Sequence, residues 1–190
     1  MSHIEEAERA IDGIGRLALF DRKGGDGFGR DRAAAARSFV AYLLVLPAIA
    51  LVIAVQLVQS EATSPGLFVT ANIIGQIIAV AGFPLLLIPV LRLYRRPERW
   101  AWFISAYNWF NAARVVLSLG VLGLCITVLQ GLGDWPLLMF DVYAWIIEAF
   151  MAEAILEVGG ARAAAIVLLD AFFSFAVGAV ANWIATGSFF

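Results

Sequence analysis

The stretch GLFVTANIIGQIIAVAGFPLLLIPVLRL, residues 66–93, decides the fold class. It holds no charged residue before Arg92, and it is longer than the roughly 20 residues that span the hydrocarbon core of a bilayer. Comparable apolar stretches accompany it on both sides. The chain is therefore predicted to be an all-α integral membrane protein, a bundle of about five transmembrane helices. The expected spans cover about residues 34–57, 66–93, 100–129, 136–156 and 161–184.

Composition supports a lipid environment for most of the chain. Of the 190 residues, 62% are hydrophobic, and the mean hydropathy of +0.88 lies far above that of soluble domains. The first 33 residues are polar, which predicts a cytoplasmic segment at 1–33 and a five-helix transmembrane domain at 34–190. One lysine against twelve arginines, with abundant alanine and glycine, is typical of a GC-rich bacterial gene. The bacterial inner membrane is the expected location.

The basic residues predict the orientation of the spans. Seven of them precede Phe39, four lie between the second and third spans, and Arg162 lies between the fourth and fifth. The other two loops and the C-terminal tail carry none. Because lysine and arginine concentrate in cytoplasmic loops, this alternation predicts a cytoplasmic N-terminus and an extracytoplasmic C-terminus.

Residues 1–33 combine an amphipathic pattern with a glycine-rich linker. Apolar residues recur at spacings of three and four, and we expect this helix to lie on the membrane surface or on a partner, outside the bundle. Residues 21–32, DRKGGDGFGRDR, are interpreted as a flexible linker. A phosphate-binding loop is disfavoured because no strand precedes the glycines and no Gly-Lys-Ser/Thr follows them. The apolar stripe consists of Ile4, Ala7, Ile11, Ile14 and Ala18.

The sequence disfavours most familiar enzyme chemistries. His3 is the single histidine and Cys125 the single cysteine, so neither a histidine metal cluster nor a Ser-His-Asp arrangement is available. No catalytic residue, metal ligand, cofactor or nucleic-acid partner is predicted. The expected partners are the lipid bilayer and other membrane proteins or further copies of the chain.

Charged and amide side chains inside the spans mark the candidate site. A charge at mid-bilayer costs at least about 2.5 kcal/mol, so it needs a partner or a function. At about 1.5 Å per residue, Arg114, Glu148 and Asp170 lie about 13 to 21 Å from the cytoplasmic ends of their helices. We expect Arg114 to be held by Glu148 or Asp170, which leaves one carboxyl group to exchange a proton. The predicted polar network also includes Asp141, which shares a helix face with Glu148, and Asn108 and Asn111.

Three segments resemble uncharacterised small multispan membrane proteins of alphaproteobacteria: FGRDRAAAARSFVAYLLVLPAIA (28–50), ISAYNWFNAARVVLSL (104–119) and ARAAAIVLLDAFFSF (161–175). In spacing and hydropathy, residues 28–187 are also similar to the bacterial Yip1-like membrane proteins. This resemblance implies a short cytoplasmic N-terminus followed by five spans. The Asp-Leu-Tyr-Gly-Pro signature of the eukaryotic Yip1 branch is absent, and the resemblance implies no site residues.

Two functions fit these features. The first is a non-enzymatic membrane protein that assembles with, scaffolds or organises other membrane components, in which the charged network is structural and fixes helix register. The second is a small proton-coupled transporter or channel component that uses the intramembrane Arg/Glu/Asp network. An intramembrane enzyme comes third, since no ligand spacing supports it.

The alternation of basic loops generates a test of topology. Reporter fusions after Ser64 and after Gly133 are expected to behave as extracytoplasmic, and a fusion after Arg96 as cytoplasmic. A cytoplasmic signal from the Gly133 fusion would contradict the predicted orientation.

Overall fold

All elements in the described part of the chain are helices. The computed structural model describes residues 3–60, 64–133 and 135–187. In chain order the elements are α1 (His3–Ala18), η1 (Arg22–Gly27), α2 (Arg32–Ser38), α3 (Val40–Leu44), α4 (Leu46–Gln59), α5 (Pro65–Leu93), η2 (Pro97–Arg99), α6 (Trp100–Thr127), η3 (Gln130–Leu132), α7 (Trp135–Leu156) and α8 (Gly160–Thr186).

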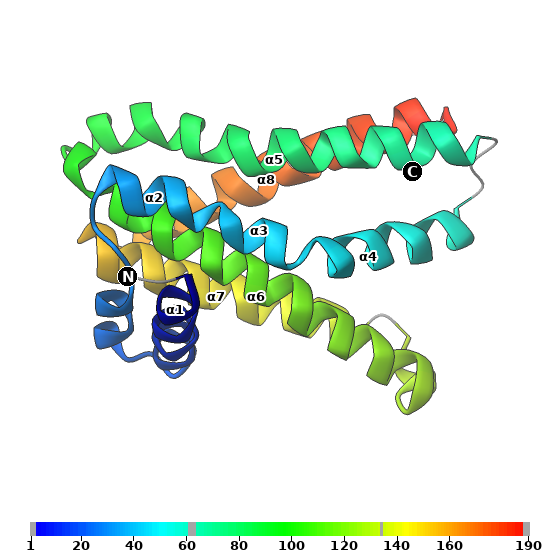
Figure 1. Ribbon diagram of the computed structural model, residues 1–190, viewed down its shortest axis with the longest axis horizontal. Helices are drawn as coiled ribbons and strands as arrows, with labels where there is room; N and C mark the ends of the chain where they lie inside the picture. The colour runs from blue at the N-terminus through cyan, green and yellow to red at the C-terminus, as the bar shows by residue number, and fades with distance from the viewer. Residues whose placement is uncertain (1–2, 61–63, 134, 188–190) are drawn as a thin grey trace.

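Four long helices lie along the long axis of the molecule (Figure 1). α5 packs on α8, and α6 packs on α7, which in turn contacts α8. The α5–α8 pair and the α6–α7 pair lie close together at the end that carries α1, and they diverge toward the opposite end (Figure 1). These are called here the α1 end and the far end. The chain starts near the α1 end, and α8 finishes at the far end.

Among the described residues, three helical segments are long and apolar enough to cross a membrane: α5, Pro97–Thr127 and α8. The bent pair Arg32–Leu44 and Leu46–Val58 makes a fourth if it forms one span. α7, which carries Asp141, Glu148 and Glu153, is not among them. The described part of the chain is therefore all-helical with three to four candidate spans, against the expected count of about five.

Proline affects the first two expected spans differently. The first is broken at Val45 with a bend of 50°, and Pro47 falls in the first turn of α4, a position that tolerates proline. α5 continues as one helix through Pro84 and Pro89. The indole Nε1 of Trp100 donates a 2.8 Å hydrogen bond to the carbonyl oxygen of Pro84.

The core is concentrated at the α1 end. Fully buried side chains from α5, α6, α7 and α8 meet there, among them Phe83, Phe103, Met151 and Ile166. Between apolar helices in lipid, cohesion comes from close van der Waals packing, so this interdigitated layer holds the four helices together. Toward the far end, α6 and α8 expose most of their apolar side chains.

The α7–α8 connection is short, and a glycine C-cap does not end α7. α7 ends at Leu156, and Glu157 takes the left-handed conformation with φ +52°. Gly159 precedes α8 in an extended conformation instead. The guanidinium of Arg99 donates to the carbonyl oxygen of Ile155 at 2.9 Å and pairs with Glu157 at 2.7 Å. The Arg99 side chain thus provides a hydrogen-bond donor for a carbonyl group in the last turn of α7.

α1 and the following glycine-rich segment are part of the packed structure. The buried residues of α1 are Glu6, Ala10, Gly13 and Leu17. Three residues of the expected apolar stripe, Ala7, Ile14 and Ala18, are partly buried and pack against the core. α1 contacts η1, α6 and α7. The segment expected to be a flexible linker forms η1, because its glycines let two backbones approach closely.

One pair of glycines shows how close this approach is. A Cβ atom placed on Gly24 would lie 2.5 Å from the carbonyl oxygen of Gly13 and 2.8 Å from the Leu17 side chain. The backbones at Gly13 and Gly24 cannot move apart to make room for a Cβ atom without separating α1 from η1. The Gly13–Gly24 contact therefore anchors α1 to the rest of the chain.

Replacing Gly24 with alanine is expected to destabilise the protein by about 1–3 kcal/mol through this overpacking. Gly15→Ala is the matched control, since nothing lies within 4 Å of a Cβ there and alanine favours a helix by up to about 1 kcal/mol. Thermal unfolding in detergent gives the melting temperatures of both variants. Equal melting temperatures for the two variants would mean that α1 is not anchored on η1.

Candidate functional site

A polar cleft separates the two helix pairs in the far half of the bundle. Its volume is about 400 Å³, and α5, α6, α7 and α8 all contribute to its wall. On α6 the polar residues recur at spacings of three and four, which places them on one helix face. The polar side chains that line the cleft are Asn72, Gln76, Asn111, Arg114, Ser118, Asp141 and Ser174.

Arg114 and Asp141 form an ion pair across this cleft. The guanidinium Nη2 of Arg114 donates to the carboxylate Oδ1 of Asp141 at 2.8 Å. The side chains are 24% and 44% exposed, so the pair borders the open volume. The expected ion pair with Glu148 or Asp170 is wrong, because the partner that contacts Arg114 is Asp141.

The positions of the two residues along their helices explain why Arg114 pairs with Asp141. Counted from the α1 ends of α6 and α7 at 1.5 Å per residue, Arg114 lies at about 21 Å and Asp141 at about 22 Å. The same count gives about 12 Å for Glu148 and about 15 Å for Asp170. The two residues at equal depth on neighbouring antiparallel helices are the ones that pair.

Glu148 is completely enclosed. Its exposure is 0%, and neither carboxyl oxygen has a hydrogen-bond partner among the residues that the structure describes. Asp170 and Arg114 are close enough to act on it electrostatically, the first repelling and the second attracting a negative charge. Buried polar groups nearly always have partners, so an unpartnered carboxyl here calls for a functional explanation.

Asp170 accepts a hydrogen bond from α6. The Tyr107 hydroxyl donates a 2.7 Å hydrogen bond to its Oδ1. The Tyr107 ring packs against Phe83 and Phe103, with centroid distances of 4.7 and 6.0 Å, which fixes the direction of the hydroxyl. Asp170 is 5% exposed, and Ser174, one helical turn further along α8, lines the polar cleft. The buried carboxyl pair, Glu148 and Asp170, therefore lies just beyond the inner end of the cleft.

The two asparagines of the predicted network are separated. Asn111 lines the cleft, and its Nδ2 donates to the carbonyl oxygen of Tyr107 at 3.1 Å. Asn108 is fully buried and instead donates from Nδ2 to Ser38 Oγ of α2 at 2.9 Å. Its Oδ1 has no partner within the described ranges. Asn108 thus ties α6 to the first span and takes no part in the cleft.

Sequence reasoning missed two contributors from the first span. Ser38 is fully buried and holds Asn108, and the Tyr42 side chain lies within electrostatic range of both Glu148 and Asp170. Neither has a distinctive spacing, and only the contact of α2 and α3 with α6 brings them to the site. The role of Tyr107 was also missed, although it belongs to the polar face of α6.

A double-mutant cycle tests the ion pair. Arg114→Gln and Asp141→Asn are expected to be coupled by about 0.5–3 kcal/mol in the free energy of unfolding in detergent, because each change removes the same contact. The control cycle combines Arg114→Gln with Asp170→Asn, which touches no shared ion pair and should give a smaller coupling. A larger coupling in the control would restore the pairing expected from the sequence.

Comparison with protein-family models, curated proteins and solved structures gives no match for this chain. The resemblance to Yip1-like membrane proteins stays a prediction, and the function is argued from the site.

Proposed function

We propose that this protein is a small proton-coupled transporter or channel component, in which Glu148 and Asp170 take up and release protons. The observation that carries the proposal is the complete enclosure of Glu148 without a hydrogen-bond partner in the described structure. A carboxylate in that position would be a buried charge without a contacting partner, which is strongly unfavourable. Proton uptake removes the charge without rearranging the helices.

The surroundings of Glu148 support exchange of this proton. Asp170 is a second acidic group nearby, so one proton is able to serve both. The polar cleft supplies room for water, and its wall ends about one helical turn from Asp170. In the exchange, a hydronium ion in the cleft gives its proton to a carboxylate and leaves as water, and release is the reverse.

Access to the carboxyl pair is one-sided. Between Glu148 and the α1 end lies the apolar core, with Ile104, Met151 and Ile166 fully buried. A proton that enters from the far end therefore needs a rearrangement before it leaves at the α1 end. The bend at Val45 is a suitable hinge, because the first span contacts α6 and ends beside α5. Such gating favours slow, carrier-like transport over an open pore.

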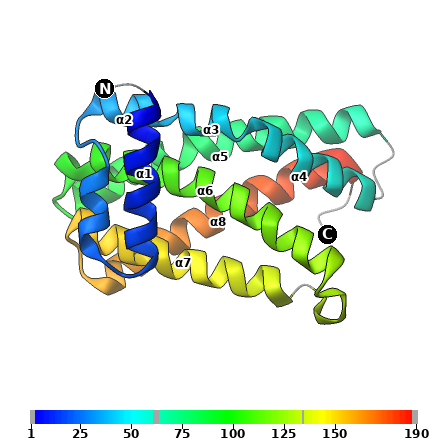
Figure 2. The ribbon, with the colours of Figure 1, turned by 60° about the horizontal axis from the view of Figure 1, so that its bottom comes forward.

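The proposal includes five spans, with α7 as the fifth, in a bacterial inner membrane with a cytoplasmic α1 end. α7 supports this count because it runs beside α6 and α8 between the two ends (Figure 1). α1 crosses the long helices near one end, as expected of a helix in the membrane surface (Figure 2). Ile11 and Leu19 remain 68% and 81% exposed, which suits contact with lipid.

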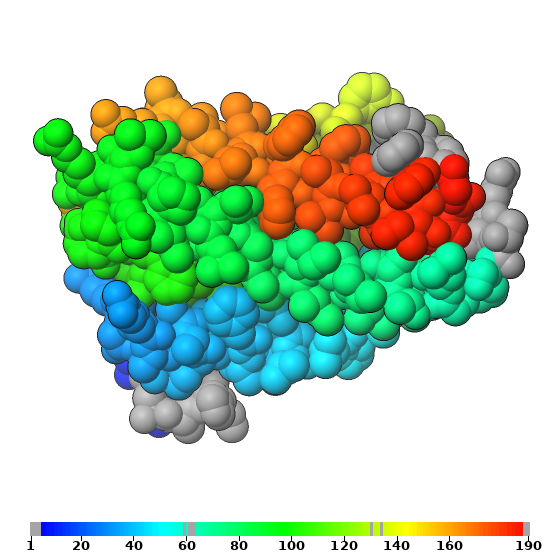
Figure 3. Space-filling view, turned by 90° about the horizontal axis from the view of Figure 1, so that it is seen from above, coloured from blue at the N-terminus to red at the C-terminus, as the bar shows by residue number. Residues whose placement is uncertain are grey.

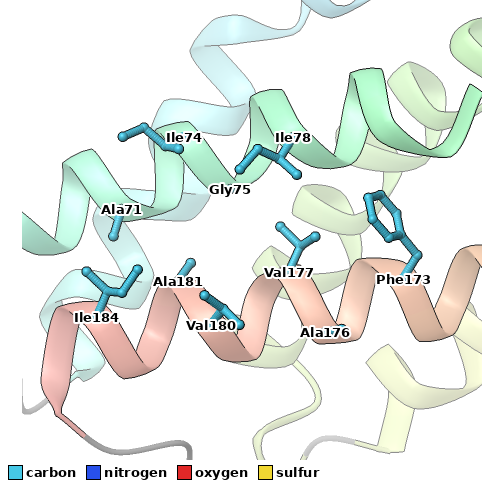
Figure 4. A pocket seen from close by; sticks show the side chains of 10 residues that line it. All are labelled: Ala71, Ile74, Gly75, Ile78, Phe173, Ala176, Val177, Val180, Ala181 and Ile184. Carbon is cyan, nitrogen blue, oxygen red and sulfur yellow. The ribbon is translucent and has the colours of Figure 1, made fainter. Parts of the chain in front are cut away.

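A second candidate function is assembly with other membrane proteins or further copies of the chain, the scaffold role that the sequence also suggests. Its support is the face formed by α5 and α8, which lie side by side on one surface (Figure 3). Both helices contribute to a wholly apolar groove of about 260 Å³ there (Figure 4). Small residues such as Gly75, Ala176 and Ala181 line it and allow close helix approach.

Proton flux into liposomes tests the leading function. The purified protein is reconstituted with an internal pH-sensitive dye, and a potassium diffusion potential drives proton entry. We expect faster acidification than in empty liposomes, and we expect Glu148→Gln to abolish the difference because the amide exchanges no proton. Glu153→Gln, on the same helix but paired with Arg22 at 2.5 Å, is the control and should retain the flux.

If Glu148→Gln folds and conducts like the native chain, the carboxyl pair is structural. The scaffold role would then be favoured. Equal loss in both variants would point to damage to α7 in general and would also contradict the proposed role of Glu148.

A further inference from the structure

A second hollow, unrelated to the carboxyl pair, lies at the α1 end. It has a volume of about 540 Å³ and is formed by the start of α2, the end of α5, η2 and the start of α6. Three arginines line it, Arg30 and Arg32 from the segment before α2 and within its first turn, and Arg92 from α5. We call it the arginine groove.

Two of these guanidinium groups form no ion pair or hydrogen bond with another described residue. Arg30 pairs with Asp26 at 2.7 Å and lies over the Trp102 ring at 4.1 Å, so its position is fixed. Arg32 and Arg92 are exposed, and neither has an ion pair or hydrogen bond with any residue that the structure describes. Two cations that face one groove without acceptors form a recognition site for an anion.

The carboxylates of the groove form no ion pair with Arg32 or Arg92 in the described structure. Asp31 and Glu98 also line the groove. Asp31 accepts a 2.7 Å hydrogen bond from the backbone N–H of Ala34 and caps α2, so it is occupied with the helix end. Arg30 is already paired with Asp26, so the two guanidinium groups left for a ligand are those of Arg32 and Arg92.

The floor of the groove is apolar and continues along α5. Leu91 and Ala101 are buried, and the Trp100 indole is held by its hydrogen bond to the Pro84 carbonyl. Arg92, Ile88 and Leu85 are spaced by four and three residues, so they share one face of α5. Leu85 is 64% exposed. A cationic head site thus adjoins an apolar track that runs toward the middle of the bundle.

We propose that the arginine groove binds the headgroup phosphate of an anionic phospholipid, with an acyl chain lying along Ile88 and Leu85. The arginines Arg32 and Arg92 contact the phosphate, and the apolar face of α5 contacts the chain. A free phosphate ester shares the headgroup chemistry but has nothing to place on the apolar track. Basic pockets between helices at a membrane surface are suited to such lipids.

Native mass spectrometry of the full-length chain in detergent provides the test. The probes are phosphatidylglycerol and phosphatidylcholine with the same acyl chains, and glycerol phosphate serves as the chain-free probe. We expect a 1:1 adduct with phosphatidylglycerol, little with phosphatidylcholine and none with glycerol phosphate. The Arg32→Gln/Arg92→Gln variant should bind phosphatidylglycerol at least about tenfold more weakly, from roughly 1 kcal/mol per basic residue.

Arg95→Gln is the matched control, because it removes one positive charge from the same end of α5 but lies outside the groove. Its affinity for phosphatidylglycerol should stay within about twofold of the native value. Unchanged binding by the double variant overturns the proposal, as does equal loss in Arg95→Gln, which would indicate diffuse attraction. Tight binding of glycerol phosphate would overturn the lipid assignment in favour of a soluble phosphate.

Discussion

The constraint on which this structure depends is the placement of acidic side chains along the helices of an apolar bundle. α7 carries three of them at spacings of seven and five, and each is accommodated differently. Asp141 is paired with Arg114 in the polar cleft, and Glu153 is paired with Arg22 at the α1 end. Glu148, between them, has no partner in the described structure. The helix pairs diverge toward the far end (Figure 1), and the polar cleft between them ends about one helical turn from Asp170, which lies near Glu148.

The all-helical class and the approximate extent of the long helices could be predicted from the sequence because hydropathy marks long apolar stretches. The long apolar stretch at residues 66–93, for example, forms the single helix α5. The expected first span, in contrast, is broken at Val45. The packing of residues 1–33 could not be predicted in this way. Glycines 13 and 24 indicate a flexible backbone when taken alone, and their close approach depends on where η1 folds back on α1. The same glycines thus give flexibility in isolation and tight packing in context.

The candidate site was predicted as a set of residues and only partly as a geometry. Arg114, Glu148 and Asp170 were selected because charges in spans are costly, a property of each residue alone. Which of these side chains contact one another depends on the relative depth and rotation of neighbouring helices. A closer depth count would have matched Arg114 with Asp141, whereas the Tyr107–Asp170 hydrogen bond depends on side-chain directions that spacing does not specify. Ser38 and Tyr42 required the tertiary contact of the first span with α6.

The account places a proton-exchanging carboxyl at Glu148, and infrared difference spectroscopy tests this claim most directly. Spectra of the reconstituted protein are recorded at two pH values and in H₂O and D₂O, for the native chain and for Glu148→Gln. The account predicts a carboxylic acid C=O band that depends on pH, shifts in D₂O and is missing from the Glu148→Gln difference spectrum. A native spectrum whose carboxylic acid bands are all retained in Glu148→Gln would contradict it.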